Sequence, residues 1–63
     1  MYLEEETEEL SFYEIMMRAR RRQEIVIGYH RVFKERPVIN PPNKATRKHW
    51  SLDDSFIVLV EKL

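Results

Sequence analysis

The 63-residue sequence contains no cysteine and only one glycine. Without cysteine it can form neither a disulfide nor a thiolate metal site, the two devices that usually stabilise very small folds. A chain of this length buries only about 60 % of the surface that its unfolded form exposes, so its hydrophobic core is marginal. We therefore expect the chain to cover apolar surface by self-association or by attachment to a larger protein.

Long hydrophobic runs are also missing. No apolar stretch approaches the roughly 20 residues that a transmembrane helix requires. The N-terminus has no positively charged segment followed by an apolar core, so we expect no signal peptide. A hydrophobic fraction of 43 % is too high for a disordered tail, and 35 % charged residues suit a soluble surface. These features favour a cytoplasmic location.

The sequence offers no assembled catalytic or metal-binding constellation. One glycine cannot build a phosphate-binding loop, and Ser11 lacks the flanking glycines of a nucleophile elbow. His30 and His49 lie far apart, with no carboxylate at ligand spacing. Asp53 and Asp54 could offer oxygen to a hard cation, but adjacent aspartates before a strand more often cap a turn. We predict that the chain is not an enzyme, with no catalytic residue, cofactor or metal.

Charge is balanced overall but unevenly distributed. Six glutamates precede the first base, Arg18, whereas bases dominate afterwards. An acidic start and a basic end suit the dipole of a helix. Six of the basic side chains form a candidate surface for a small anionic ligand: Arg20, Arg22, Arg31, Lys44, Arg47 and Lys48. Nucleic acid is a less favoured ligand, because the net charge is zero and the acidic segment would repel a polyanion.

A helix is predicted to begin at Ser11 and to end at about Arg22 or Gln23. Ser11 and Glu14 have the spacing of a capping box. The apolar residues Phe12, Ile15, Met16 and Ala19 then form one stripe with helical spacing. Glu14 and Arg18 also stand four apart, in the order that favours an ion pair on a helix.

Two strands are predicted, at residues 24–32 and 55–61, and both have apolar residues on two faces. In the first, Ile25, Ile27 and Tyr29 should share one face, and Gly28 should mark a bulge or a close backbone approach. Two apolar faces in the second predict a central or interface-covered position.

Shorter segments connect these strands. Residues 33–36 should form a turn and residues 38–39 a short strand that ends at the ordered corner 40–42, whose prolines stop the ladder. Residues 44–50 should be a basic loop and residues 51–54 a polar turn.

This order predicts an α+β fold, in which one N-terminal amphipathic helix packs on a small, mainly antiparallel three-stranded sheet. Residues 1–10 would be an acidic lead-in and residues 11–63 the domain. One helix cannot cover both faces of the sheet, so we expect a two-fold dimer. Alternatively, the lead-in folds back as an extra strand and covers part of that surface.

The capped helix, the strand, Val-Ile-Asn-Pro-Pro at residues 38–42 and Leu-Asp-Asp-Ser-Phe-Ile-Val-Leu-Val at residues 52–60 resemble a TrkA-C domain, the C-terminal subdomain of regulators of potassium conductance. Arg-Arg-Arg-Gln-Glu-Ile-Val-Ile-Gly-Tyr-His-Arg at residues 20–31, together with Ile-Asn-Pro-Pro-Asn-Lys at residues 39–44, resembles more narrowly the CASTOR/POLLUX ion-channel family. Asp53 departs from the turn glycine usual in the wider family. The leading strands of a TrkA-C domain would precede residue 1, which implies a fragment or a shortened relative.

The resemblance implies a cytoplasmic regulatory or assembly module of a potassium or other cation channel or transporter. Such a module would couple ligand binding or oligomer state to gating. Its partners would be a second copy of itself and the rest of a membrane channel chain, through which it would be membrane-associated. The alternative function is a small module that binds a nucleic acid or an anionic ligand with its Arg and Lys surface.

Overall fold

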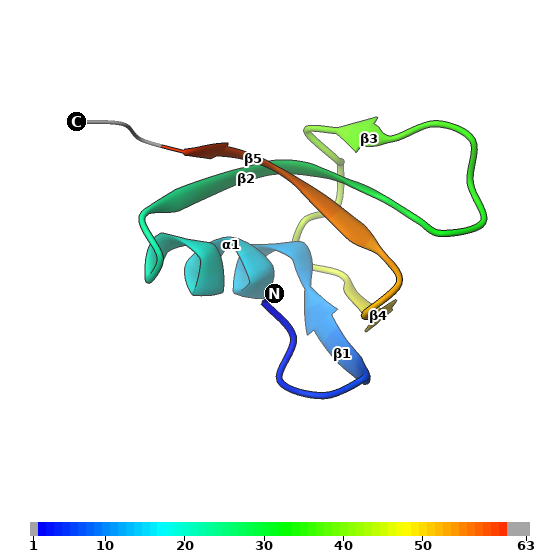
Figure 1. Ribbon diagram of the computed structural model, residues 1–63, viewed down its shortest axis with the longest axis horizontal. Helices are drawn as coiled ribbons and strands as arrows, with labels where there is room; N and C mark the ends of the chain where they lie inside the picture. Colours follow the sequence, from blue (N-terminus) through cyan, green and yellow to red (C-terminus); the bar gives the residue numbers. More distant parts are fainter. Residues whose placement is uncertain (1, 61–63) are drawn as a thin grey trace.

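The computed structural model describes residues 2–60 and contains one helix and five strands, which confirms the predicted α+β class (Figure 1). In chain order the elements are β1 (Thr7–Ser11), α1 (Phe12–Arg20), β2 (Glu24–His30), β3 (Val38–Ile39), β4 (Arg47–Ser51) and β5 (Ser55–Val60). The strands form two antiparallel sheets, one with the order β3-β2-β5 and one in which β1 pairs with β4. In Figure 1, α1 lies against one side of the long β2–β5 pair. Within residues 2–60, the helix is too short to cross a membrane.

The start of α1 follows the predicted capping box. The Ser11 hydroxyl accepts a hydrogen bond from the Glu14 amide at 3.2 Å, and the Glu14 carboxylate accepts one from the Ser11 amide at 3.1 Å. The predicted stripe is confirmed, because its members are buried or pack against the core: Phe12, Ile15, Met16 and Ala19. Burying each large side chain stabilises the fold by roughly 1.5–3 kcal/mol.

The end of α1 differs from the prediction. The helix stops at Arg20, two to three residues early, and Gln23 adopts a φ of 60°, which turns the chain into β2. The expected ion pair between Glu14 and Arg18 is also wrong. Arg18 instead reaches Glu8 of β1, 2.7 Å away, because a bidentate contact with a less exposed carboxylate was available across the fold.

Gly28 in the central strand β2 is both a bulge and a close approach, as predicted. The pairing register with β5 shifts between Val26 and Gly28. A Cβ atom on Gly28 would lie 3.1 Å from the Cα of Ile39 and closer still to the carbonyl oxygen of Val38. The bulge turns Tyr29 inward, where it is 92 % buried, so the prediction that Tyr29 shares a face with Ile25 and Ile27 is wrong.

Of the two positions expected for β5, central or interface-covered, the structure excludes the first, because β5 is an edge strand of its sheet. Its two apolar faces are as predicted. Phe56 and Val58 pack against the core, whereas Ile57 and Leu59 lie on the opposite, outer face. Residue 61, the expected end of this strand, lies outside the described residues.

The predicted basic loop at residues 44–50 is wrong, because Arg47–Ser51 forms β4 and pairs with β1 in the acidic lead-in. Trp50 anchors this strand with 1 % of its surface exposed, and its indole N–H donates to the Leu10 carbonyl at 2.8 Å. The lead-in therefore does fold back as a strand, as the alternative held, but it pairs with β4 and not with the β3-β2-β5 sheet.

The predicted corner before β4 is ordered. The Asn40 amide donates to the Ile27 carbonyl at 2.7 Å, and Asn40 takes a positive φ of 49°. Pro41 is among the most completely buried side chains of the described residues. The corner thus ends β3 with its backbone fixed to β2.

The core combines residues from both sheets, the helix and the lead-in. Tyr2, Leu3 and Leu10 of the lead-in are all buried in it. An aromatic cluster joins the two sheets, with ring centroids of Tyr29 and Trp50 5.0 Å apart and nearly perpendicular. Further aromatic pairs extend the cluster to Phe12, Tyr2 and Phe56. This cluster fixes the position of the strand ends that carry the candidate site.

Candidate functional site

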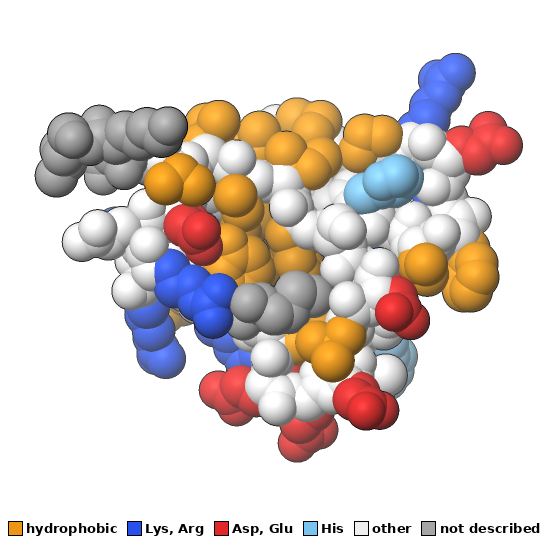
Figure 2. Space-filling view, in the orientation of Figure 1, with side chains coloured by type: hydrophobic (Ala, Val, Ile, Leu, Met, Phe, Trp, Pro, Cys, Tyr) orange, Lys and Arg blue, Asp and Glu red, His pale blue; other side chains and the backbone are white. Residues whose placement is uncertain are grey.

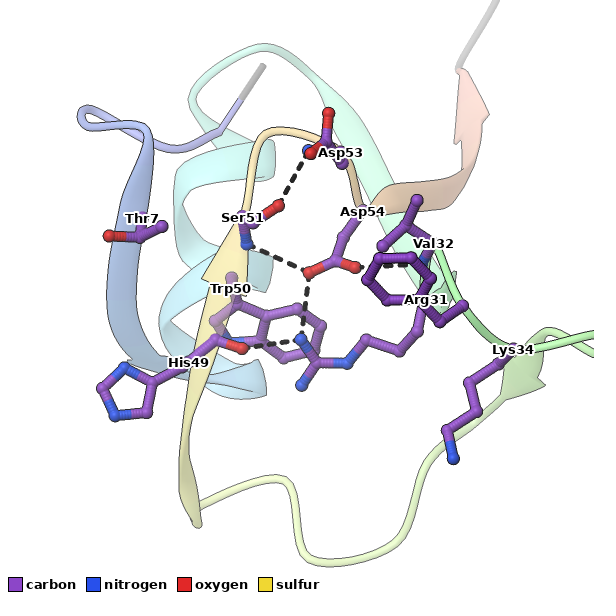
Figure 3. A pocket seen from close by; sticks show the side chains of 10 residues that line it. Thr7, Arg31, Val32, Lys34, His49, Trp50, Ser51, Asp53 and Asp54 are labelled. Carbon is purple, nitrogen blue, oxygen red and sulfur yellow. Dashed lines mark hydrogen bonds and ion pairs between the residues drawn. The ribbon is translucent and has the colours of Figure 1, made fainter.

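Asp54 links the ends of β2, β4 and β5. Its carboxylate is buried and accepts hydrogen bonds from the Ser51 amide at 3.0 Å, the Val32 amide at 3.2 Å and the Arg31 guanidinium at 3.0 Å (Figure 3). The Arg31 Nη1 atom also donates to the His49 carbonyl at 2.6 Å. These bonds confirm that Asp54 caps the turn, and they add a partly buried ion pair that the sequence did not reveal.

The guanidinium of Arg31 stacks on the aromatic cluster. It lies 4.0 Å from the Trp50 ring centroid and 5.4 Å from that of Tyr29. This partly covered cation is stabilised by the quadrupoles of the two rings as well as by the Asp54 carboxylate. Arg31 therefore has a structural role in addition to any role in binding.

A shallow pocket of about 540 Å³ opens beside this ion pair (Figure 3). Its lining is mainly apolar and comes from Thr7, Arg31, Val32, Phe33, Lys34, His49, Trp50, Ser51, Asp53 and Asp54. Three of its polar side chains are engaged in structure, since the Ser51 hydroxyl accepts from the Asp53 amide at 3.0 Å and the Asp54 carboxylate accepts from Arg31 and from two backbone amides. The pocket is suited to recognition of a surface and not to proton transfer.

The six predicted anion-binding residues do not form one surface. Arg20 and Arg22 lie at the end of α1, where Arg22 stacks over the Tyr2 ring. The Lys44 amine bonds to Asn40 and to the Pro41 carbonyl. The remaining three lie near β4, but Arg47 is paired with Glu9 and Glu14, and Arg31 is paired with Asp54. Of these three, only Lys48 has no carboxylate within 4 Å among residues 2–60.

Two basic residues that the prediction omitted lie close to Lys48. Lys34 and Arg36 line a second hollow, of about 610 Å³, with Tyr29, Arg31, Phe33, Glu35, Val38 and Lys48. The turn composition of residues 33–36 was visible in the sequence. Its proximity to Lys48 was not, because it depends on how β4 packs beside the end of β2.

The lead-in carries the strongest electrostatic perturbations. The bidentate hydrogen bond from Arg18 lowers the pKa of Glu8 to about 2, and the amide of Glu4 adds to this effect. Burial, followed by a hydrogen bond to Glu24, raises the pKa of Tyr2 to about 12. These groups hold the lead-in on α1 and β2, so they contribute to the scaffold. In the part of the chain that the structure describes, no three His, Asp or Glu side chains converge as a metal site.

An apolar face remains open on the other side of the β3-β2-β5 sheet. Ile25, Ile39 and Leu59 are each more than half exposed there, with Ile27 and Ile57 half-buried between them. Figure 2 shows hydrophobic side chains gathered along the side of the molecule where these three strands lie. We call these five residues the outer face.

Comparison with known proteins relates the chain to ion channels, although no family model matches it. It is 61 % identical over 57 residues to ion channel CASTOR of Lotus japonicus and 55 % identical over 62 residues to probable ion channel CASTOR of Oryza sativa subsp. japonica. It is 56 % identical over 52 residues to probable ion channel POLLUX of Arabidopsis thaliana. These matches cover 90 %, 98 % and 82 % of this chain.

The chain spans only about 6–7 % of the length of these relatives. These relatives are named as ion channels and not as enzymes. Homology to them confirms the prediction that the chain is not an enzyme. The predicted resemblance to the CASTOR/POLLUX family is confirmed as well: the chain is a close homologue of one short segment of the CASTOR/POLLUX-type ion channels.

Proposed function

We propose that the chain is a regulatory and assembly module of a CASTOR/POLLUX-type cation channel and acts on the cytoplasmic side of the membrane. The homology to a segment of named ion channels supports this function, because it extends over most of the chain. The TrkA-C-like interpretation supplies the regulatory part of the proposal. According to this interpretation, the module transmits ligand occupancy or a change of oligomeric state to the pore through its contacts with the rest of the channel.

The outer face is the surface through which we propose that the module assembles. Ile25 and Leu59 are opposite each other in the β2–β5 pairing, and both are more than half exposed. A contiguous apolar patch of this kind marks a protein interface. A second copy is the occupant that we propose, because a two-fold contact lets one apolar face cover an identical one. Each aliphatic side chain that becomes fully buried would contribute roughly 1.5–3 kcal/mol.

The fold is suited to passing on a change at this interface. Strand β2 is hydrogen-bonded on both sides, and its end is fixed to β4 and β5 by Arg31 and Asp54. A shift between two paired copies would therefore move each module as a rigid body. Rigid-body rotation about an interface is a common route by which one site controls another.

Sedimentation equilibrium at tens of micromolar tests the assembly part. The chain should be dimeric, and Leu59→Glu should make it monomeric, because a carboxylate in an apolar interface is strongly disfavoured. The matched control is Met17→Glu, since Met17 is 63 % exposed on α1, away from the outer face. A wild-type chain that is monomeric yet folds cooperatively would contradict this part.

A chimeric channel tests the regulatory part. This chain would replace the matching segment of Lotus japonicus ion channel CASTOR, and currents would be recorded in planar bilayers. We expect Leu59→Glu to change the open probability and Met17→Glu to leave it unaltered. A channel that gates identically with both variants would contradict the regulatory proposal.

The alternative function, a module for a nucleic acid or an anionic ligand, has one specific observation in its favour. Lys34, Arg36 and Lys48 line a common hollow, and none has a carboxylate within 4 Å among residues 2–60. Binding of a single-stranded oligonucleotide that weakens steeply with salt would favour the nucleic-acid form. Binding of a small anion without oligonucleotide binding would favour the anionic-ligand form.

A further inference from the structure

We propose that the hollow around Lys34, Arg36 and Lys48 binds a phosphomonoester group. This inference deepens the anionic-ligand alternative, on which it rests, and it names the ligand class and the residues. It does not depend on self-association through the outer face, because none of the five outer-face residues lines the hollow.

The first step is that some basic side chains form ion pairs within the fold, whereas others remain exposed to solvent. Arg18 is paired with Glu8, Arg31 with Asp54, and Arg47 with Glu9 and Glu14. In contrast, Lys34 and Arg36 are exposed and make no side-chain hydrogen bond within the described residues, and Lys48 only lies over the Tyr29 ring at 5.6 Å. Cations used by the scaffold are thus separate from cations available to a ligand.

The second step is the charge of the hollow. Arg31 is neutralised by Asp54, which leaves three cations, Lys34, Arg36 and Lys48, against the single carboxylate of Glu35. Three positive charges minus one give a net charge of +2. A phosphomonoester carries about −1.5 to −2 charges at pH 7, so one such group would neutralise the hollow. Without it, three like charges share one rim at an electrostatic cost.

The third step is preorganisation of the turn. The Lys34 amide donates to the Arg31 carbonyl at 3.1 Å, and the His30 ring lies 2.8 Å from the Lys34 carbonyl. A carbonyl can only accept, so Nε2 of His30 carries the hydrogen. Figure 3 shows the Lys34 side chain pointing away from Asp54. These bonds hold the backbone at Lys34, and its amine does not compete with Arg31 for Asp54.

The fourth step concerns the rest of the ligand. The hollow measures about 610 Å³, within the range of small-molecule sites. Phe33 beside it is 94 % exposed, and Tyr29 forms part of its wall. An arginine can bind a phosphate through two parallel hydrogen bonds, while the aromatic rings offer an apolar surface. The geometry thus suits an organic phosphate, which is either a soluble compound or the headgroup of a phospholipid.

Calorimetric titration of the full 63-residue chain tests the site. The soluble probe is phenyl phosphate, a phosphomonoester, and the lipid probe is phosphatidylcholine vesicles containing phosphatidic acid, compared with phosphatidylcholine alone. The double variant Lys34→Glu/Arg36→Glu should weaken the binding of whichever probe the wild type binds by at least about tenfold, because charge-assisted hydrogen bonds are lost. The matched control, Arg20→Glu/Arg21→Glu, makes the same change in net charge at the exposed end of α1.

The outcomes distinguish a failure of this site from a failure of the anionic-ligand function on which it rests. Equal weakening by both double variants would overturn the site, since binding would then follow net charge alone, but it would leave an anionic-ligand function standing. Binding of neither probe would overturn both. Binding of phenyl phosphate alone would assign a soluble phosphomonoester. Binding of phosphatidic acid vesicles that Phe33→Ser weakens would assign the lipid headgroup, with Phe33 entering the membrane interface.

Discussion

The guanidinium carbon of Arg31 lies 4.0 Å from the centroid of the Trp50 ring, while Nη1 of the same side chain bonds to the Asp54 carboxylate at 3.0 Å. The Arg31 side chain therefore links the Trp50 indole of β4 to the turn that precedes β5. A planar guanidinium is the group that can stack and donate at once, which the ammonium of lysine cannot do.

Arg31→Lys is accordingly expected to destabilise the chain, although it keeps the charge. The loss should be about 1–3 kcal/mol, because the buried carboxylate of Asp54 loses a well-placed charged donor. Urea denaturation followed by tryptophan fluorescence measures it, and Trp50 is the only tryptophan. Arg20→Lys on the exposed face of α1 is the matched control. Equal midpoints for the two variants would mean that the stacked ion pair contributes nothing.

Gly28→Ala should be more disruptive than its single methyl group suggests. The added Cβ would overlap the carbonyl oxygen of Val38 and lie 3.1 Å from the Cα of Ile39. Backbone atoms cannot move aside as a flexible side chain can, so β3 must shift away from β2. We expect a loss of about 1–3 kcal/mol, in the range of overpacked cores, measured by thermal unfolding. Thr46→Ala in an exposed bend is the control, and a variant as stable as this control would disprove the close approach.

Ser11→Ala tests the capping box. The hydroxyl of Ser11 satisfies the Glu14 amide, which has no partner within the helix. Its removal should cost about 1 kcal/mol. Ser55→Ala, at an exposed position of β5, provides the comparison in the same urea titration. Indistinguishable unfolding curves would show that Glu14 alone fixes the helix start.

Features with a local physical cause were predictable from the sequence. The capping box and the apolar stripe of α1 need only residues within two turns of each other, and Gly28 marks its own bulge. The β1–β4 pairing was missed because its sequences are mostly polar or charged and carry no apolar alternation. Its stability comes mainly from Trp50 and Leu10, which are buried and joined by the indole hydrogen bond, between segments that are distant in the chain.

The candidate site was only partly predictable for the same reason. Arg31 and Lys48 were chosen as bases, but the sequence could not tell which bases the scaffold would engage. That choice depends on where Asp54 and Glu9 lie in the folded chain. Lys34 and Arg36 were omitted because a turn between strands has no periodicity to indicate which strand end it faces.

The acid limb of the stability profile should depend on Glu8. Its side chain is largely covered, with 18 % exposed, and the bond from Arg18 lowers its pKa from 4.5 to about 2. Because the pKa is lower in the folded state than in the unfolded state, this carboxylate stabilises the fold fully above pH 4.5. The contribution is lost as the pH falls from about 4.5 towards 2, where the folded chain must also take up the proton.

Glu8→Gln is therefore expected to lower the free energy of unfolding at pH 6 and to have progressively less effect as the pH approaches 2. Urea titrations at several pH values between these limits measure the difference between wild type and variant. The pKa of Glu14 is also lowered, chiefly by its bond to the Ser11 amide, but this effect is common to both proteins and cancels in the difference. Glu5→Gln is the control, since Glu5 is exposed and its carboxylate makes no ion pair within the described residues. A difference between wild type and Glu8→Gln that stays constant down to pH 2 would show that Arg18 holds the lead-in through its bond to the Tyr2 carbonyl and not through the charge of Glu8.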